Sequence, residues 1–374
     1  MNSEQNENQS TTNHAPRRLL ICTQSVDRDD PIAGFFYSWV CEFSKYCEKV
    51  TVIALSGTGV EHLPINVQVV SLEKELQASK FRQLHLFYKA IIKHRHEYDT
   101  VFIHNVGPKF VLLGALFWKL WRKRIALWYV HGSVHWKLRV AEKLVDQAFS
   151  SAPETFRVPS KKVTFLGHGI NVEKLGSLPL HLDLHCFTIL QVSRISPRKH
   201  CDVLIEALSI FAAQYAKPFR VLFVGATTSA GDEEYLLKLH ERVNELGLSE
   251  QVSFVGGVSP QKLPEYYTRA DVTVNVTTTG GVDKTALESL AVGVPVLTTF
   301  GAFKKILGEE SYQCVLSELN EGTSVELADA LLRVAQYGTS QERRKVLKNK
   351  VTEYASLSRL IQRIITILYT EQKR

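Results

Sequence analysis

Short apolar runs alternate with segments of helical periodicity through most of the chain. In the first half, the apolar runs are rich in Val, Ile, Leu or Phe and lie at 19–23, 50–55, 67–70, 100–103, 125–130 and 163–166. Between several of them, apolar residues recur at the three- to four-residue spacing of amphipathic helices, at 34–46, 80–96, 110–121 and 138–148. Strands that alternate with helices predict an α/β fold in which helices cover both faces of a parallel sheet.

The alternation stops at 171–184 and then starts again. That segment, NVEKLGSLPLHLDL, has no sustained period and is interpreted as a linker. Beyond it, strands are predicted at 187–192, 219–224, 252–255, 272–276 and 296–299, with helices at 201–215, 232–246, 261–269 and 284–292. Ligands of such sheets bind outside the carboxyl ends of the strands, so two sheets predict a cleft between their strand ends.

Domain boundaries follow from this pattern. Residues 1–16 form a polar tail that we expect to be disordered, 17–175 the first Rossmann-like domain, 176–185 the linker between domains, and 186–352 the second Rossmann-like domain. Residues 353–374 contain a last amphipathic segment, SLSRLIQRIITILY, after the second sheet is complete. Its apolar face needs a partner, and we expect this helix to return to the first domain.

Composition excludes several classes of protein. A chain of 374 residues that is 45% hydrophobic is unlike a disordered or fibrous protein. The six cysteines form no CxxC pair and have no histidine at metal-ligand spacing, which predicts neither a disulfide framework nor a metal site and suits a reducing cytoplasm. The first 18 residues lack the pattern of a secretory signal, and the longest apolar stretch, 111–118, is far shorter than the ~20 residues of a spanning helix. We therefore expect a cytoplasmic protein whose membrane contact, if it has one, is peripheral, at the inner face of the membrane.

The net charge of +7 raises the question of an anionic partner. The basic residues lack the aromatic and glycine patterns of common nucleic-acid-binding modules, so no nucleic acid partner is predicted. Two segments combine cations with aromatic residues: 80–96 (KFRQLHLFYKAIIKHRH) and 117–124 (FWKLWRKR). Basic amphipathic helices of this kind are typical of contact with an anionic membrane. The alternative is a solvated basic helix face over an apolar core.

A glycine-rich turn before a helix supplies a candidate phosphate site within 271–299. The free N–H groups and the positive dipole end of a helix at 284–292 would point back at this turn. Gly280 and Gly281 permit close backbone approach, Lys284 adds a cation, and Glu288 could accept from a ribose hydroxyl. An ordinary strand–turn–helix unit with a glycine-rich turn is the alternative.

A second candidate anion site follows the strand at 187–192. The loop after it carries Arg194, Arg198 and Lys199, and cations that leave a strand at the cleft are suited to a diphosphate. A dinucleotide-binding Rossmann site would need GxGxxG after its first strand, and this half has none there. A solvated basic loop remains the alternative.

The order of four segments resembles the donor domain of glycosyltransferase family 4, also called group 1. The segments are VSRISPRK, FVGA, VSFVGGVSPQKLPEYYTRAD and DKTALESLAVGVPVLTT, within 187–299. A weaker similarity extends to ICTQSVDRDDPIAGFFYSWV, WYVHGSVHW and FLGHGIN, where that family has its acceptor-side loops. The resemblance implies the GT-B fold: two Rossmann-like domains with parallel sheets that face each other across a cleft. It also implies a nucleotide-sugar donor as co-substrate, no metal, no other cofactor, and transfer with retention of anomeric configuration.

The resemblance assigns donor-side roles residue by residue. Arg194 and Lys199 would bind the diphosphate and stabilise it as it leaves, since fixed cations in a water-poor cleft act strongly on developing charge. Glu288 matches the second Glu of the family's Glu-x7-Glu motif, which holds the ribose hydroxyls. Residues expected to lie against the nucleobase are Gly256, Gly257, Val258 and Ser259. Backbone amides expected to meet the phosphates at the helix start are those of Thr285, Ala286 and Leu287.

On the first domain, the resemblance assigns two further residues. Gly34 matches the glycine loop that approaches the diphosphate, and His131 matches the histidine that contacts the transferred sugar near the reacting carbon. Three further residues are acceptor-side candidates, and each also has a structural interpretation: His104, Asn105 and His135.

One position departs from the family pattern. Gly280, eight residues before Glu288, stands where the family has the first Glu of its motif, beneath the transferred sugar. A covalent glycosyl-enzyme through that position is impossible, whereas a front-face displacement, assisted by the leaving phosphate, stays open. Asp283 is the nearest carboxylate and could orient the sugar; alternatively, it is a helix-start residue favoured by the dipole.

The leading hypothesis is a retaining, metal-independent hexosyltransferase. It would move a hexose from a UDP- or GDP-linked sugar to a glycan or lipid-linked saccharide in cell-surface polysaccharide assembly. The first alternative, motivated by Gly280, is a degenerate GT-B protein that binds a nucleotide without catalysis. The second is a nucleotide-sugar epimerase or phosphorylase on the same fold, for which the sequence offers no additional acid–base set and no pyridoxal-binding lysine.

Overall fold

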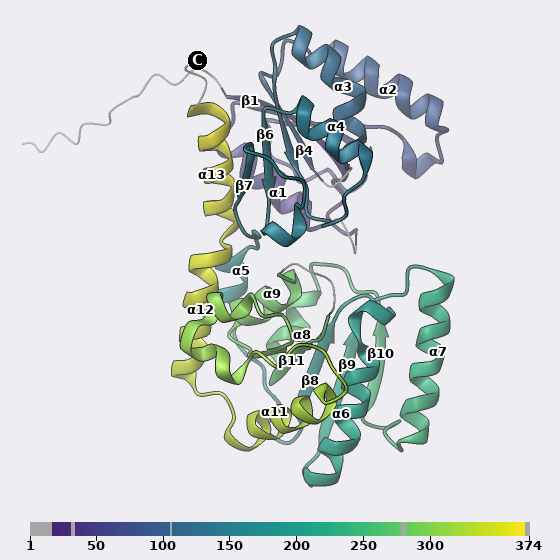
Figure 1. The fold of residues 1–374 in the computed structure, drawn as a ribbon, viewed down its shortest axis with the longest axis vertical. Coiled ribbons are helices and arrows are strands. Elements are labelled where there is room, and N and C mark those ends of the chain that lie inside the picture. Colours follow the sequence, from purple (N-terminus) through teal and green to yellow (C-terminus); the bar gives the residue numbers. More distant parts are fainter. Residues whose placement is uncertain (1–16, 31–33, 105–106, 278–281, 371–374) are drawn as a thin grey trace, which may run out of the picture.

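A computed structural model describes residues 17–30, 34–104, 107–277 and 282–370. The predicted tail at 1–16 and the site candidates Asn105, Gly280 and Gly281 lie outside the described residues. The chain forms two α/β domains, the first at the top of Figure 1 and the second below it. Each is built on one parallel sheet, which confirms the expected fold class of two Rossmann-like domains.

The first domain contains a seven-stranded sheet of order β3-β2-β1-β4-β5-β6-β7, in which all pairs are parallel. Its strands are β1 (Arg18–Ser25), β2 (Lys49–Ser56), β3 (Val67–Ser71), β4 (Thr100–His104), β5 (Arg124–Trp128), β6 (Gln147–Ser150) and β7 (Val163–Phe165). The chain order reverses between β1 and β4. The carboxyl ends of neighbouring strands separate there, and this is where ligands of such sheets bind.

Alternating side chains of the strands bury both faces of this sheet. Leu20 and Cys22 point into a core shared with α2, α3 and α4, whereas Leu19 and Ile21 point into a core shared with α1 and α13. These helices are α1 (Phe35–Ser44), α2 (Lys80–Lys93), α3 (Lys109–Leu120), α4 (Trp136–Leu144) and α13 (Leu357–Thr370).

The second domain contains a five-stranded parallel sheet of order β10-β9-β8-β11-β12. Its strands are β8 (Phe187–Val192), β9 (Phe219–Val224), β10 (Val252–Gly256), β11 (Val272–Asn275) and β12 (Val296–Thr298). One face packs against α6 (Cys201–Gln214), α7 (Ala230–Glu245) and α11 (Thr323–Tyr337). The other packs against α5 (Val172–Gly176), α8 (Leu263–Arg269), α9 (Lys284–Val292), α10 (Phe303–Leu307) and α12 (Gln341–Ala355).

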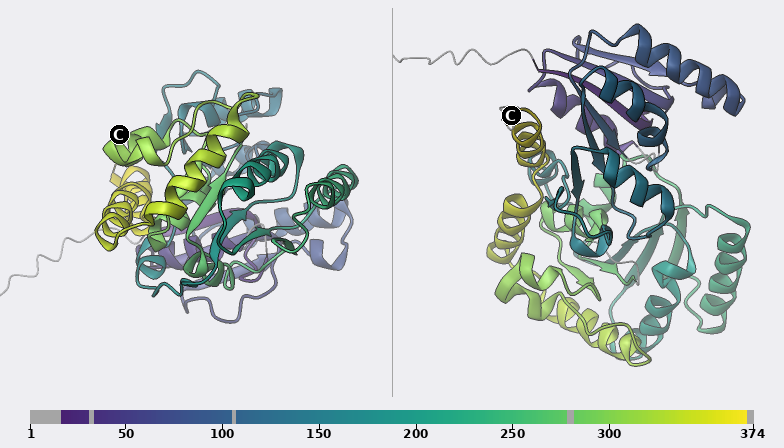
Figure 2. Two further views of the ribbon diagram at one scale, coloured as in Figure 1. Left: turned by 90° about the horizontal axis from the view of Figure 1, so that it is seen from below. Right: turned by 45° about the horizontal axis from the view of Figure 1, so that its top comes forward.

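The last helix, α13, leaves the second domain and lies along the first (Figures 1 and 2). One side of it, including Leu360, Ile361 and Ile364, is buried against the sheet and α1. Two hydrogen bonds fasten its end: Arg124 Nη1 donates to the Leu368 carbonyl at 2.9 Å, and Tyr369 Oη donates to the Arg18 carbonyl at 3.0 Å. Within the described ranges, no helix combines the length and apolar character needed to cross a bilayer.

One local prediction is wrong. The helix expected at 138–148 ends with α4 at Leu144, and Gln147–Ser150 instead forms the buried strand β6 between β5 and β7. Asp146 breaks the helix because its carboxylate accepts from the Ile125 amide at 2.8 Å, at the start of the neighbouring strand. The segment interpreted as a linker contains α5, whose N-cap Asn171 accepts from the Lys174 amide at 3.0 Å.

Gly225, the residue after β9, brings two strand ends close together. Its φ is 151°, a Cβ added there would lie 1.8 Å from the Ser193 carbonyl oxygen, and its amide donates to the Gly256 carbonyl at 2.9 Å. We expect Gly225→Ala to lower the free energy of unfolding by about 1–3 kcal/mol, because backbone would have to move. Urea denaturation would measure this.

Gly231→Ala is the matched control, because a Cβ on Gly231 meets nothing closer than 4.0 Å and the residue lies in the first turn of α7. That substitution is expected to be neutral or to stabilise the helix by up to about 1 kcal/mol. Equal urea midpoints for the two variants would contradict the steric argument.

Candidate functional site

A cavity lies between the two domains, where the carboxyl ends of their strands face each other. The first domain contributes Gly34 and Phe35, at the start of α1, to its wall. The polar and charged side chains that the second domain contributes include Gln261, Tyr267, Lys284 and Glu288. This wall therefore brings together the two halves of the predicted donor site.

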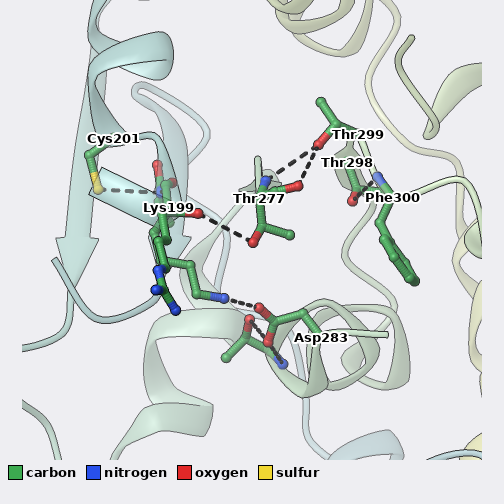
Figure 3. Close-up of polar contacts among 10 residues, drawn as sticks. Lys199, Cys201, Thr277, Asp283, Thr298, Thr299 and Phe300 are labelled. Carbon is green, nitrogen blue, oxygen red and sulfur yellow. Dashed lines mark hydrogen bonds and ion pairs between the residues drawn. The ribbon is translucent and has the colours of Figure 1, made fainter. Parts of the chain in front are cut away.

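Lys199 is held at the end of the loop that follows β8. Gln191, within that strand, donates from Nε2 to the Lys199 carbonyl at 2.9 Å. The Lys199 ammonium forms an ion pair with Asp283 at 2.5 Å (Figure 3). The two side chains are 16% and 17% exposed. A predicted cation and a predicted carboxylate, 84 positions apart in the chain, thus neutralise each other at the start of α9.

Asp283 also begins the helix α9. Its Oδ1 accepts from the Thr285 amide at 3.3 Å and from the Thr285 hydroxyl at 3.1 Å, which is N-cap geometry. Burial opposes ionisation, but Lys199 and hydrogen bonds from Asn275 and Thr285 outweigh it and hold the pKa of the Asp283 carboxyl below its ordinary value. Asp283 is therefore an anchored carboxylate.

The loops after β8, β11 and β12 are fastened to one another around this pair (Figure 3). Thr277, beyond β11, donates from its amide to Thr299 Oγ1 at 3.3 Å and from its hydroxyl to the Arg198 carbonyl at 3.4 Å. Because these bonds join three strand ends, the position of Lys199 is set by the sheet as well as by its own loop.

Lys284 crosses the cleft to the first domain. Its ammonium lies 3.1 Å from the centroid of the Phe35 ring, a cation–π contact between the domains. Burial lowers the pKa of Lys284 to about 7, against the opposing effect of Glu288 and Asp283. A cation that has lost most of its water in this way would interact strongly with a phosphate in the cleft.

Glu288 lies one turn further along α9. Tyr267 Oη donates to its Oε2 at 3.1 Å. Burial raises the pKa of Glu288 to about 7, although the Tyr267 hydrogen bond and the Lys284 charge act in the opposite direction. The protonation of this carboxyl, and with it its strength as a hydrogen-bond acceptor, therefore changes near neutral pH.

Other predicted donor residues lie around this centre. Arg194 is exposed and donates to Thr228 Oγ1 at 3.5 Å. The segment Gly256–Ser259 begins at the last residue of β10, at the same sheet edge, and Val258 packs partly against the core around α9. Two of the three amides expected at a phosphate already have acceptors, because the Thr285 amide donates to the Asp283 carboxylate and the Leu287 amide to the Asp283 carbonyl at 3.3 Å.

Gly34 allows two segments of the first domain to come close. A Cβ there would lie 2.5 Å from the Asp30 carbonyl oxygen, to which the Gly34 amide donates at 2.9 Å. The same loop reaches the second domain, since Gln261 Nε2 donates to Asp29 Oδ1 at 2.8 Å. The predicted glycine loop is therefore part of the contact between the domains.

The acceptor-side histidines differ in their surroundings. His131 follows β5 and is exposed, with its ring centroid 5.4 Å from that of Tyr129. His135 caps α4, since its Nδ1 accepts from the Leu138 amide at 3.2 Å. His104 is 2% exposed, and its ring stacks on that of Phe36 with the two centroids 3.9 Å apart. Burial holds the pKa of His104 well below the ordinary value. These contacts give His135 and His104 structural roles.

Several residues in the cleft or near its charged groups had no assigned role in the sequence prediction. They are Phe35, Gln261, Tyr267, Asn275 and His168. His168 lies within the quoted segment FLGHGIN; it is buried, and desolvation together with Lys284 lowers its pKa to about 3. Its position in that segment was the available signal, whereas Phe35 and Tyr267 have the appearance of ordinary core aromatics in the sequence.

The two parallel-sheet domains and the cleft between them define a GT-B protein. A solved structure with the same arrangement is that of HepE from Anabaena in complex with UDP-glucose. Its sequence is 19% identical to this chain, and the two structures superpose with a TM-score of 0.71. The match covers 95% of this chain and 100% of the HepE chain. At that identity the likeness concerns the fold.

Residues 182–351 match the family model described as glycosyl transferases group 1. Mannosylfructose-phosphate synthase from Agrobacterium fabrum is 33% identical over 121 residues, or 32% of this chain and 27% of that protein. Alpha-monoglucosyldiacylglycerol synthase from Streptococcus pneumoniae is 33% identical over 110 residues, or 29% of this chain and 23% of that protein. These matches thus span about a quarter of the relatives' length. The second domain therefore resembles the group 1 glycosyl transferases, in agreement with the sequence motifs.

Proposed function

We propose that this chain transfers a hexose from a UDP- or GDP-linked donor to a hydroxyl group of a glycan or lipid-linked saccharide. The single observation that carries this proposal is the cavity that Lys284 and Glu288 of α9 line opposite Gly34, with Lys199 held by Asp283 at the start of the same helix. The names of the two relatives are consistent with sugar transfer, one to a sugar phosphate and one to a lipid. Cell-surface polysaccharide assembly is the proposed setting.

The donor would bind mainly to the second domain. Glu288 would accept from the ribose hydroxyls through the oxygen that Tyr267 leaves available, and Gly256–Ser259 would lie against the base. Lys199 and Lys284 would meet the diphosphate, with Arg194 at its exposed side. Lys199 already forms an ion pair with Asp283. A diphosphate would therefore either share the Lys199 ammonium with the Asp283 carboxylate or displace that carboxylate from it.

The proposed chemical step is a front-face displacement with retention and without a metal. The acceptor hydroxyl oxygen forms a bond to the anomeric carbon as the bond from that carbon to the diphosphate oxygen breaks. The hydroxyl proton passes to the departing phosphate oxygen, and the nucleoside diphosphate leaves. Lys199 and Lys284 stabilise the negative charge that develops on it, which is the largest contribution these residues can make. His131 would orient the sugar.

A thermal-shift panel of UDP-, GDP- and ADP-linked sugars tests the proposal. A donor at 100 times its Kd should stabilise the protein by about 2.7 kcal/mol. We expect a clear rise in Tm with one UDP- or GDP-linked sugar, followed by transfer or slow hydrolysis of that donor. Absence of any shift with all donors and with free UDP and GDP would contradict the proposal.

The second candidate function is nucleotide binding without catalysis. It is favoured by Gly280, where the resembling family has a carboxylate beneath the transferred sugar. Binding of UDP or GDP, together with neither transfer nor hydrolysis of any sugar donor, would support it over the transferase.

A further inference from the structure

The excess positive charge of the chain is concentrated in one stretch of the first domain. Residues 76–141 contain 12 Lys and Arg and 2 Asp and Glu, whereas the rest of the chain contains 33 and 36. This stretch comprises α2, β4, α3, β5 and most of α4. Because β4 and β5 are largely buried, the charge lies mainly on the helices and their connecting loops.

The helices α2 and α3 lie side by side on the outer side of the sheet (Figures 1 and 2). Tyr88 Oη donates to the Leu113 carbonyl at 3.2 Å, and the rings of Tyr88 and Phe117 are 5.5 Å apart. Their inner residues, including Phe87 and Trp118, are buried in the core. The two helices therefore present one combined outer surface, which we call the α2–α3 face.

The α2–α3 face combines large exposed apolar side chains with cations. Its apolar members and their exposed fractions are Phe81 (87%), Ile92 (43%), Leu116 (77%) and Leu120 (75%). Its exposed cations include Lys80, Lys89, Lys93, Lys119 and Arg122. These five form no ion pair with any residue in the described part of the chain. Single exposed apolar side chains are common, but a group of them on two neighbouring helices, among unpaired cations, is typical of an interaction surface.

Charge complementarity and the apolar side chains together specify the partner. We propose that the α2–α3 face docks on an anionic lipid bilayer. Lipid phosphates would attract the lysines, and the hydrocarbon boundary would take up Phe81, Leu116 and Leu120. A nucleic acid would satisfy the cations but would leave these aliphatic side chains in water, so it fits the face less well.

This docking would place the cleft close to the membrane surface. Helix α4, which contacts α3, begins at His135 and exposes Trp136 (64%) at its first turn. The loop before α4 begins at the end of β5, beside His104 at the end of β4. Burial, together with the charge of Lys284, lowers the pKa of the His104 imidazole. A lipid-linked acceptor held at the bilayer could enter from this side. That consequence rests on the proposed function, whereas the docking does not.

Sedimentation of the purified full chain with vesicles tests the docking. The probes are vesicles of phosphatidylcholine alone and vesicles that also contain phosphatidylglycerol, at low salt. We expect binding to the anionic vesicles that weakens as salt is added. The triple variant Lys89→Gln, Lys93→Gln, Lys119→Gln should bind at least about tenfold more weakly, since each cation near such a surface contributes about 1 kcal/mol.

Two further variants separate the contributions. Lys305→Gln, Lys345→Gln, Lys350→Gln removes the same charge from exposed positions of the second domain and should bind like the unaltered protein. Phe81→Ser with Leu116→Ser keeps every charge and should also bind more weakly, because insertion of apolar side chains is lost.

Three results would overturn the proposal. The first is no sedimentation of the unaltered protein with anionic vesicles. The second is an equal loss of vesicle binding in the two triple-lysine variants. The third is tighter binding to duplex DNA than to vesicles, with the DNA binding unchanged in Phe81→Ser with Leu116→Ser. Donor-induced thermal shifts of the same variants test the proposed function separately, since none of these residues lines the cleft.

Discussion

Replacing Lys199 with Met is expected to lower kcat/KM for the sugar donor by roughly a hundred- to a thousandfold. Removing a fixed hydrogen-bond donor that faces developing negative charge in a water-poor site costs about this factor in rate. Lys199 is fixed because its carbonyl accepts from Gln191 and its ammonium is paired with Asp283. The same substitution leaves the Asp283 carboxylate buried without its cation. Loss of one partner of a buried pair typically costs about 3–5 kcal/mol of stability. Steady-state kinetics and urea denaturation would measure the two effects.

The double variant Lys199→Met, Asp283→Asn separates catalysis from stability. An asparagine keeps a side-chain oxygen that can accept from the Thr285 amide, so α9 retains a cap, and no buried charge is left unpaired. We expect most of the lost stability to return while turnover stays low. Recovery of turnover in the double variant would mean that Lys199 serves only to neutralise Asp283, which contradicts its assignment to the leaving diphosphate.

Helices and strands with clear boundaries could be predicted from the sequence. The predicted strand at 219–224 and the predicted helix at 284–292 have the bounds of β9 and α9. Pro218 precedes this strand and Gly225 follows it, and an N-cap Asp283 and a left-handed Gly293 end the helix. Local chemistry fixes such boundaries without help from the rest of the fold.

Elements that depend on distant partners escaped prediction. Helix α12 faces the core partly through Arg344, whose guanidinium donates to the Gly293 carbonyl at 3.0 Å, so its inner side has no continuous apolar stripe. Strand β6 is four residues long and gains its place from pairing with β5 and β7. A short segment of this kind has too little periodicity to be told from the end of a helix.

The residues of the candidate site could be predicted from the sequence, but the contacts among them could not. Spacing and motif order single out Lys199, Lys284 and Glu288, because cations and carboxylates after strands point to phosphate and ribose recognition. The sequence gives no sign that Lys199 would pair with Asp283, or that Phe35 from the other domain would cover Lys284. Those contacts depend on how loops and domains are placed in space, and they decide how much free charge the cleft offers to a donor.

Glu288→Gln is expected to weaken donor binding by roughly ten- to a hundredfold above neutral pH. A hydrogen bond to an ionised group contributes about 1.5–3 kcal/mol, and the amide lacks that charge. Because burial raises the pKa of Glu288 to about 7, the carboxylate of the unaltered protein is lost as the pH falls through that value. The contribution of Glu288 to donor affinity should therefore fall toward acid pH in the unaltered protein and be absent in Glu288→Gln, whereas Lys284 acts in the opposite direction in both proteins. Calorimetric titration from about pH 6 to about pH 9 would measure both.

The stability of the free protein is a poor substitute for this measurement. A carboxyl whose folded pKa is raised to about 7 contributes stability that is lost as the pH rises through 7. Lys284, whose pKa is lowered to about 7, contributes stability that is lost as the pH falls through 7. The Glu288 loss develops as the pH rises from 4.5 to about 7 and the Lys284 gain as the pH rises from about 7 to 10.5, so the unfolding free energy should pass through a minimum near pH 7 that reports neither group alone.

Lys284→Met provides the control for the pH dependence. The Lys284 charge lowers the pKa of Glu288, so its removal should move the midpoint of the donor-affinity curve above pH 7. Lys284 itself gains a proton as the pH falls and then attracts phosphate more strongly. The substitution removes this second pH-dependent effect. The remaining curve then reports the carboxyl alone. An unchanged midpoint in Lys284→Met, or a pH profile of Glu288→Gln that follows that of the unaltered protein, would contradict the assignment of Glu288 to the ribose.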